Sequence, residues 1–392
     1  MAHQNSNEPL ADLTRPGQSN ATGDARALYL KLFSGEMFKG FQQNAIARDL
    51  VMKRTLKNGK SLQFIFTGRT TAEYHTPGNS ILGNSDAAPP VAEKTITCDD
   101  LLISSAFVYE LDEVLSHYDL RSEISRKIGY ALAEKYDRLI FRQVVKAARQ
   151  ASPITKANFL EPGGSQIQVG ANTADAYDAD KLVDAFYNAA AMMDEKGVST
   201  DGRVAVLTPR QYYKLIQEAG NNALINRDVR GDALQSGKGV AEIAGIKIYK
   251  SVNIPFQGSH GVKLGSNSVP SKADGRYGDF VGDDMKTVQP NTAGNNGVRN
   301  NYGEAGTDGD DSGDTATSSF STTCGLIFQK EAVGCVEAIA PQVQVTSGDV
   351  SVIYQGDVIL GRLAMGADAL NPAAAVELHT GTAGNLDGFV DP

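Results

Sequence analysis

Residues 119–150 carry the longest uninterrupted helical pattern in the chain. Their apolar side chains recur at spacings of three and four residues, which is the period of one face of an α-helix. Asp119 can cap the first turn, and no proline follows until Pro153. At a rise of ~1.5 Å per residue the helix would be roughly 45 Å long, so we expect the fold to be organised around one rod.

The side of this helix that lies away from the apolar stripe is basic. Its Lys and Arg residues outnumber the acidic residues Glu123, Glu134 and Asp137. The basic residues are Arg121, Arg126, Lys127, Lys135, Arg138, Arg142, Lys146 and Arg149. Two hypotheses fit this pattern: an ordinary solvated helix face, or a structural spine whose basic side faces a polyanion.

Composition limits the class of protein. With 392 residues the chain is long enough for two domains with cores of their own. The net charge of −9 argues against a protein that binds nucleic acid through its bulk charge. Residues 1–60 nevertheless carry nine basic and five acidic residues, whereas residues 257–320 carry five basic and nine acidic ones. This asymmetry predicts two surfaces in different surroundings.

Cysteine usage and hydropathy bear on the compartment. The three cysteines, Cys98, Cys324 and Cys335, are an odd number without metal-ligand spacing, so we expect free thiols in a reducing compartment. The first 24 residues lack the apolar centre of a signal peptide, and no apolar run reaches ~18 residues. We therefore expect a protein that is made and kept in a cytoplasm and does not enter a membrane.

Residues 51–98 read as an extended excursion of two strands. The segment 51–68 has a hairpin pattern in which Asn58 and Gly59 supply the turn, which predicts type I′ geometry. Residues 91–98 then return as a second strand. Because an isolated hairpin is marginally stable in water, we expect this excursion to lie against something else, such as a neighbouring subunit.

The remaining segments follow simpler patterns. Residues 1–23 read as a disordered tail, residues 24–49 as a helix and residues 151–177 as a loop. An alternation of strands and helices predicts a second, α/β domain over residues 179–344. Its expected elements are a helix at 181–196, a strand at 203–207, a helix from Thr208, strands at 246–252, 324–329 and 342–346, and a surface insert at 257–320.

Motifs that carry chemistry are absent or incomplete. Lys60 and Ser61 follow Gly59 like the end of a phosphate-binding loop, but Arg54 stands where the loop requires its first glycine. Residues 308–313 resemble the opening of a calcium loop, but the twelfth position is Ser319 instead of glutamate. The five histidines have no metal-ligand spacing. The sequence therefore indicates no catalytic, cofactor or metal site.

Several long stretches, in the same order along the chain, resemble the major capsid proteins of short-tailed double-stranded DNA phages of the podovirus type. The strand at 241–255 leads into an S-x-N-[IL]-P pattern that is common in tailed-phage capsid proteins. The resemblance covers nearly the whole chain except the first 22 residues, the insert and the last dozen residues. The stretches that carry it are RALYLKLFSGEMFKGF (26–41), GKSLQFIFTGRTTAEYHTPGNSI (59–81), DDLLISSAFVYELDEVLSHYDLRSEI (99–124) and ILGRLAMGADALNPAAAVEL (359–378).

The resemblance implies an α+β chain with the Hong Kong-type tailed-phage capsid fold. The implied parts are an N-terminal arm at 1–50, an extended hairpin loop at 51–98, a peripheral domain at 99–178 and 345–380 with the spine helix 119–150, an axial domain at 179–344 with the insert 257–320, and a C-terminal tail at 381–392.

The same resemblance implies a structural function without catalysis or a cofactor. The chain would form hexamers and pentamers of an icosahedral head, with a scaffolding protein, a portal protein at one vertex and packaged double-stranded DNA as partners. It would be assembled in the host cytoplasm and reside in the virion. The basic residues of the spine would face phosphate without reading sequence. The expected contacts with a neighbouring subunit are Lys57, Lys60, Phe64, Phe66 and Arg69, with no covalent crosslink.

Two alternatives remain open at this level. An encapsulin-type protein compartment uses the same fold around a protein cargo, and its contents would distinguish it from a phage head. An enzyme is the third hypothesis, although one without grouped histidines, cysteines or a phosphate loop would be unusual.

Overall fold

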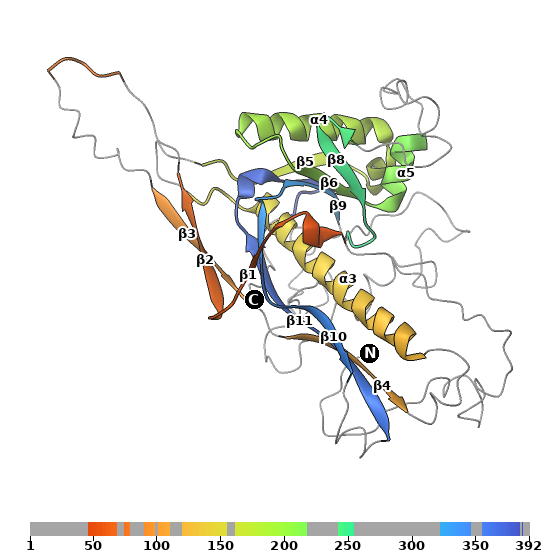
Figure 1. Ribbon diagram of the computed structural model, residues 1–392. Helices are drawn as coiled ribbons and strands as arrows, with labels where there is room; N and C mark the ends of the chain where they lie inside the picture. The colour runs from red at the N-terminus through yellow and green to blue at the C-terminus, as the bar shows by residue number, and fades with distance from the viewer. Residues whose placement is uncertain are drawn as a thin grey trace, which may run out of the picture. The chain divides into compact units, whose positions relative to one another are not determined.

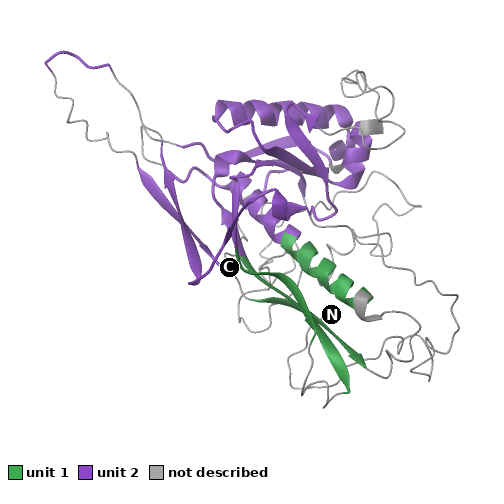
Figure 2. Ribbon diagram, in the orientation of Figure 1, with its two compact units in different colours: residues 1–45, 99–136, 337–365 green, residues 46–98, 137–336, 366–392 purple. Residues whose placement is uncertain are grey.

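The structure is a computed structural model that describes residues 46–68, 74–78, 90–98, 101–109, 120–154, 161–217, 242–254, 322–345, 355–384 and 386. The chain divides into two compact units, which Figure 2 shows in different colours. Unit 1 comprises residues 1–45, 99–136 and 337–365, and unit 2 comprises residues 46–98, 137–336 and 366–392.

The predicted spine helix is confirmed. Helix α3 runs from Leu120 to Arg149, thirty residues without a break (Figure 1). The helix belongs to unit 1 up to Tyr136 and to unit 2 from Asp137 onwards. The apolar period of the sequence was sufficient to set its length because no proline interrupts it.

Unit 1 packs the first part of α3 on a β-sheet. Strand β4 (Leu102–Tyr109) pairs antiparallel with β11 (Gly356–Ala369), and β10 (Val333–Val345) is the next strand in the sheet. The buried side chains of this core are Val108, Ile128, Leu132 and Ile359. Gly361 of β11 approaches the helix so closely that a Cβ there would overlap Ile128. The Tyr136 hydroxyl also donates a hydrogen bond of 3.0 Å to Glu337 Oε1.

Unit 2 is built on a six-stranded mixed sheet in the order β5-β12-β9-β6-β8-β7. Pairs β5–β12 and β6–β8 are parallel, and the other pairs are antiparallel. All seven residues of β9 are buried, so the centre of the sheet is covered on both faces. The bounds are Ser165–Gly170 (β5), Arg203–Leu207 (β6), Glu242–Ile243 (β7), Ile246–Lys250 (β8), Thr323–Gln329 (β9) and Ala375–Thr380 (β12).

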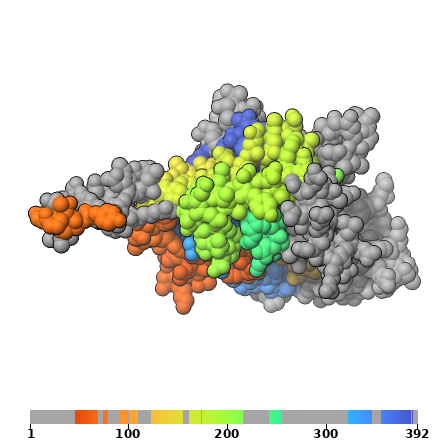
Figure 3. Space-filling view, turned by 90° about the horizontal axis from the view of Figure 1, so that it is seen from above, coloured from red at the N-terminus to blue at the C-terminus, as the bar shows by residue number. Residues whose placement is uncertain are grey.

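Two helices of unit 2 lie where the sequence predicts them, although α4 starts two residues before the expected residue 181. Helix α4 (Ala179–Glu195) packs against β5, starts with the Asp178 carboxylate accepting from Asp180 N, and its outer side is open to solvent (Figure 3). Helix α5 (Pro209–Gln217) starts with Gln211 Oε1 accepting from both the backbone N and the hydroxyl of Thr208. A side-chain oxygen thus accepts from a backbone N–H at the start of each helix. The remaining 3₁₀ elements are η2 (Ala47–Asp49), η3 (Thr173–Tyr177) and η6 (Pro372–Ala374).

The predicted loop at 151–177 was wrong, because it contains β5 and η3. Only Ile167 and Val169 of the strand SQIQVG are apolar, and both are buried. Their burial depends on the parallel partner β12, more than two hundred residues later. A strand this short and polar has too few apolar residues to give a period of two.

The predicted type I′ hairpin at Asn58-Gly59 was also wrong. Strand β1 (Met52–Thr55) lies next to β10, whereas β2 (Ser61–Thr67) pairs antiparallel with β3 (Val91–Thr97). Gly59 has a φ of +95°, but Asn58 is not among the described residues with positive φ, which this turn type requires at both positions. Strand β3 offers apolar side chains to β2, whereas β1 offers Lys53 and Arg54, so burial favours the distant partner.

The sheet of unit 2 joins segments that the sequence assigns to two different domains. Strands β5 and β12, which the sequence places in the peripheral domain, share one sheet with β6, β8 and β9 of the predicted axial domain. The strand predicted at 342–346 is the end of the longer β10. Several predicted features lie outside the described residues: most of the arm 1–50 with its tail and helix, Arg69, the insert 257–320 with its calcium-like loop, and most of the tail 381–392.

Candidate functional site

The β2–β3 hairpin of unit 2 presents two different faces. Neighbouring side chains of a strand point to opposite sides, and the register sets Leu62 opposite Ile96 and Phe64 opposite Lys94. We name one side the anchored face, formed by Leu62, Phe64, Phe66, Ala92, Lys94 and Ile96. The other side is the open face, formed by Gln63, Ile65, Thr67, Val91, Glu93 and Thr95.

The anchored face is fixed to the body of unit 2. Ile96 is 1% exposed, and a Cβ on Gly334 would come within 2.8 Å of its Cδ1 atom. The Lys94 ammonium lies 2.8 Å from Asp368 Oδ2. A Cβ on Gly366 would overlap the Thr97 carbonyl oxygen, so only glycine permits this close approach. Packing, charge and backbone contact therefore hold this side in place.

The open face exposes apolar surface. Ile65 is 76% exposed and Val91 is 62% exposed. Ile65 lies opposite Glu93, two residues from Val91, so the two apolar side chains are diagonal neighbours at roughly 7–8 Å. A two-stranded ribbon gains little stability by itself, and exposed apolar neighbours on it mark a surface that is suited to burial by another chain.

The residues predicted to contact a neighbouring subunit do not lie on one surface of the hairpin. Phe64 and Phe66 are half-buried on the anchored face, and Lys57 and Lys60 are exposed in the segment before β2. Arg69 lies outside the described residues, and whether any of these residues contacts a second subunit stays a prediction. Sequence reasoning missed Ile65, although its position between Phe64 and Phe66 signals an apolar residue on the opposite side of the strand.

The basic residues of α3 do not form one surface. Arg138 and Arg142 are 1% exposed, Lys146 is buried, and the Arg149 side chain has no exposed area. In the part of α3 that belongs to unit 1, Arg126 and Lys127 are exposed and Lys135 is half-buried. The backbone of Arg121 lies in the helix, but its side chain is outside what the structure describes.

Arg126 is held by neighbours of its own helix. Its guanidinium bonds the Glu123 carboxylate at 2.9 Å and lies over the Tyr130 ring, 5.9 Å from the centroid. A contact between this residue and a polyanion would therefore have to compete with Glu123.

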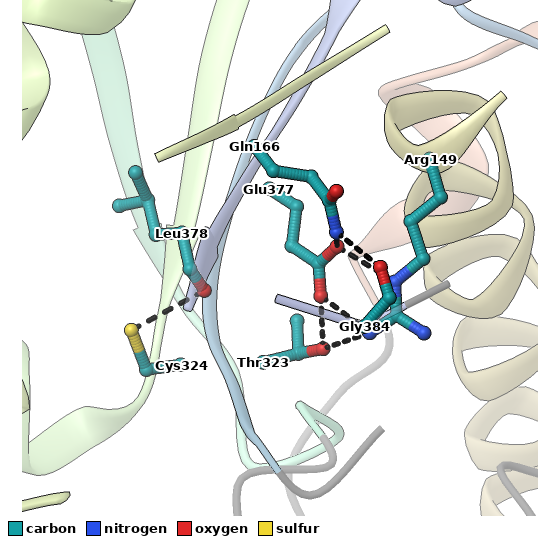
Figure 4. Close-up of polar contacts among 7 residues, drawn as sticks. All are labelled: Arg149, Gln166, Thr323, Cys324, Glu377, Leu378 and Gly384. Carbon is teal, nitrogen blue, oxygen red and sulfur yellow. Dashed lines mark hydrogen bonds and ion pairs between the residues drawn. The ribbon is translucent and has the colours of Figure 1, made fainter. Parts of the chain in front are cut away.

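Arg149 instead forms the centre of a buried polar cluster (Figure 4). Its Nε and Nη2 atoms donate to the two oxygens of Glu377 at 2.8 and 2.7 Å, and neither side chain is exposed. Thr323 Oγ1 donates to Glu377 Oε1 at 2.5 Å. Gln166 Nε2 donates to Glu377 Oε2 at 3.0 Å and to the Gly384 carbonyl at 2.7 Å. The cluster joins α3 to β5, β9 and β12, so its chemistry is structural.

Two titratable residues next to this cluster are also buried. Cys324 Sγ donates to the Leu378 carbonyl at 3.3 Å, and burial raises the pKa of the thiol to about 12. Burial lowers the pKa of His379, an effect that the Glu377 charge opposes. Cys98 and Cys335 are free cysteines like Cys324, and only Cys98 is partly exposed. The Cys324 thiol is therefore kept protonated and unreactive.

The described parts of the chain also show which side chains could bind a metal ion and which helices could cross a membrane. They contain no group of three or more His, Cys, Asp or Glu residues that could hold a metal ion. None of the helices within those parts is long and apolar enough to cross a membrane.

Sequence comparison connects the chain to phage shell proteins. A family model described as Gp10A-like major capsid protein matches residues 64–283. The major capsid protein of Escherichia phage T7 is 35% identical over 126 residues, which is 32% of this chain and 36% of the T7 protein. The match therefore spans about a third of the length of that relative.

Structural comparison extends over more of the chain. The "Capsid structure of the Cyanophage P-SCSP1u" is 30% identical in sequence, with a TM-score of 0.63 over 93% of this chain and 96% of that one. The "Asymmetric unit of bacteriophage PhiM1 mature capsid" has a TM-score of 0.60 over 94% of this chain and 97% of that one. Its 17% identity speaks for the fold alone. The predicted tailed-phage capsid fold is thus confirmed.

Proposed function

The chain belongs to the family of Gp10A-like major capsid proteins, and we propose that it builds a phage head by contacts between copies through the open face of the β2–β3 hairpin. The observation that carries this proposal is the exposure of Ile65 and Val91 on a hairpin whose other face is already anchored. A second copy that covered this face would remove both side chains from water. At roughly 25 cal/mol per Å², such burial is a favourable term for assembly.

We further propose that the copies form hexamers and pentamers of an icosahedral head in the virion. In this assembly residues 1–50 act as the arm, 51–98 as the extended loop, 99–178 with 345–380 as the peripheral part and 179–344 as the axial part. A scaffolding protein and a portal protein take part in assembly in the host cytoplasm, and no step requires catalysis. The family and the capsid structures reported above support this proposal over a protein compartment with enzymatic cargo.

For packaged double-stranded DNA we propose non-specific contact with the first part of α3. Arg126 and Lys127 are the exposed members of the predicted basic set there, with Lys135 half-buried. Lysine and arginine side chains bind phosphate without reading base sequence. The four buried members of the set, Arg138, Arg142, Lys146 and Arg149, are not part of this proposal.

Electron microscopy of the purified chain, produced together with its scaffolding protein, tests the proposed assembly. The wild type should form closed polyhedral shells. Ile65→Asp places a charge where a neighbour should bury an apolar side chain, so we expect at least about a tenfold loss of shells, the factor for roughly 1.4 kcal/mol per contact. The control is Asn188→Asp, which adds the same charge at an exposed position of α4.

Circular dichroism of both variants checks that the subunit itself still folds. Because Ile65 is largely exposed, its replacement should change the free energy of unfolding by less than about 0.5 kcal/mol. Normal shells from Ile65→Asp would reject the open face as a contact surface. A wild-type chain that stays monomeric with its scaffold would reject the assembly proposal as a whole.

A further inference from the structure

The hairpin is joined to the spine helix through one carboxylate. Asp368, near the end of β11, lies 2.8 Å from Lys94 of β3 and 3.3 Å from Lys146 of α3. Its Oδ1 atom also accepts a hydrogen bond of 2.7 Å from Ala369 N, which fixes the direction of the side chain. All of these residues belong to unit 2. A single acidic group thus connects three elements that are distant in the sequence.

The three partners differ in exposure, and this difference gives them different roles. The Lys146 side chain is 9% exposed and that of Asp368 is 15% exposed, whereas the Lys94 side chain is 32% exposed. Asp368 and Lys146 therefore form the more buried part of the group, and neither of them belongs to the hairpin. Lys94 is the more accessible partner, and its ammonium connects the hairpin to that pair.

The hairpin meets the body of unit 2 at both of its ends. Ile96 packs at Gly334 and the Thr97 carbonyl lies against Gly366 at one end. At the other end, where Gly68 N donates to the Pro90 carbonyl at 2.8 Å, a Cβ on Gly68 would come within 3.1 Å of Ile154 Cδ1. Lys94 stands between these ends, opposite Phe64. The ion pair therefore adds a third point of attachment, midway along β3, which limits bending and twisting of the ribbon between its ends.

We propose that Asp368 is a positioning residue for assembly: through Lys94 it fixes the direction of the β2–β3 hairpin, so that the open face is presented to a neighbouring copy in one orientation. This inference rests on the proposed contact between copies and adds the group that prepares the subunit for it. Fixing the hairpin before association lowers the entropy that assembly has to remove. Loss of the ion pair therefore slows assembly while the fold of unit 2 persists.

Lys94→Met is the cleanest variant. It keeps the aliphatic stem on the anchored face and leaves Asp368 paired with Lys146, so no buried charge is left alone. Asp368→Asn is the second variant, in which the amide oxygen can still accept from Ala369 N. The matched control is Lys181→Met, which removes another ion pair of unit 2, 2.6 Å long, between Lys181 and Asp175.

The direct measurement is the distance between spin labels on the unassembled subunit. Labels at Gln63→Cys on the open face and Asn188→Cys on α4 report the direction of the hairpin within unit 2. A Cys98→Ser background removes the partly exposed thiol, and the buried Cys324 and Cys335 can stay. Pulsed electron paramagnetic resonance should give a narrow distance distribution for the wild type and for Lys181→Met. Lys94→Met and Asp368→Asn should give a broad one.

The second measurement is the initial rate of shell formation by light scattering. We expect Lys94→Met to reduce this rate about two- to fivefold, the range that corresponds to a partly exposed ion pair. A narrow distribution and an unchanged rate for Lys94→Met would overturn the inference, even if the wild type assembles. Failure of every variant and of the wild type to form shells would instead reject the proposed function, while the distance distributions still decide the role of Lys94.

Discussion

The six-stranded sheet and the β2–β3 hairpin of unit 2 are built from similar residues but complete their burial in different ways. Every residue of β9 is buried, and its neighbours on both sides belong to the same chain. In β2 every second residue is exposed, and Ile65 is 76% exposed. The centre of the sheet is buried on both faces, whereas the hairpin is covered on one face only.

The polar contacts of these two regions also differ in burial. Arg149 and Glu377 have no exposed side-chain area and hold the sheet against α3. Lys94 and Asp368 are partly exposed and hold the hairpin. A buried pair contributes to stability mainly because removal of one partner leaves a charge without compensation. A more accessible pair contributes little to stability.

The largest expected loss of stability follows from replacing Arg149, which belongs to the buried ion pair of the sheet. Arg149→Met leaves the Glu377 carboxylate buried without its counter-charge, so we expect the free energy of unfolding to fall by about 3–5 kcal/mol. Urea titration followed by circular dichroism measures this loss. The double variant Arg149→Met with Glu377→Gln removes both charges and should recover most of the stability. A single variant that unfolds like the wild type would contradict the structural role of the pair.

A smaller effect is expected where the hairpin meets β11. Gly366→Ala introduces a Cβ that would overlap the Thr97 carbonyl oxygen, so the backbones must separate. We expect a loss of about 1–3 kcal/mol in the free energy of unfolding, together with faster cleavage of the hairpin by protease.

The control for this variant is the same substitution in α3. A Cβ on Gly129 meets no atom within 4 Å, so Gly129→Ala should raise stability by about 0.5–1 kcal/mol through helix propensity. Equal effects of both alanine substitutions would mean that the close approach of Gly366 to β3 does not matter.

The smallest expected effect is the pH dependence contributed by His379. Burial lowers the pKa of this imidazole below 6.5, so below that pH the unfolded chain binds a proton that the folded chain does not. The free energy of unfolding should therefore fall as the pH drops below about 6.5. His379→Gln should reduce this slope, relative to the unsubstituted chain, in a series of urea titrations. Equal slopes for the variant and the unsubstituted chain would contradict the assignment.

Predictions from the sequence succeeded where the signal was local. The period of α3 and the start of α5 after Thr208 both depend on residues within a few positions of one another. They failed for β5, whose two apolar residues gain their burial from β12, and for β1, whose partner is β10 instead of β2. The sequence pattern within a window of about ten residues does not reveal which distant strand will be the partner.

The candidate site was predictable in location but not in detail. The expectation that residues 51–98 lack burial of their own pointed to the hairpin, and the open face has that property. Which side is anchored depends on Asp368 and Gly334, and no motif links them to Lys94 or Ile96. The basic pattern of α3 could not reveal that Arg149 would meet Glu377, because the two residues are 228 positions apart.

The parallel pairing of β5 with β12 also has a consequence for the order of events during synthesis. Gln166 of β5 donates a hydrogen bond to Glu377 of β12, which is synthesised 211 residues later. At ~5–20 residues per second a ribosome needs about 10–40 s to make that stretch. Until then β5 has no partner strand and the buried carboxylate of the cluster does not exist. The sheet of unit 2 can therefore close only after synthesis has passed β12.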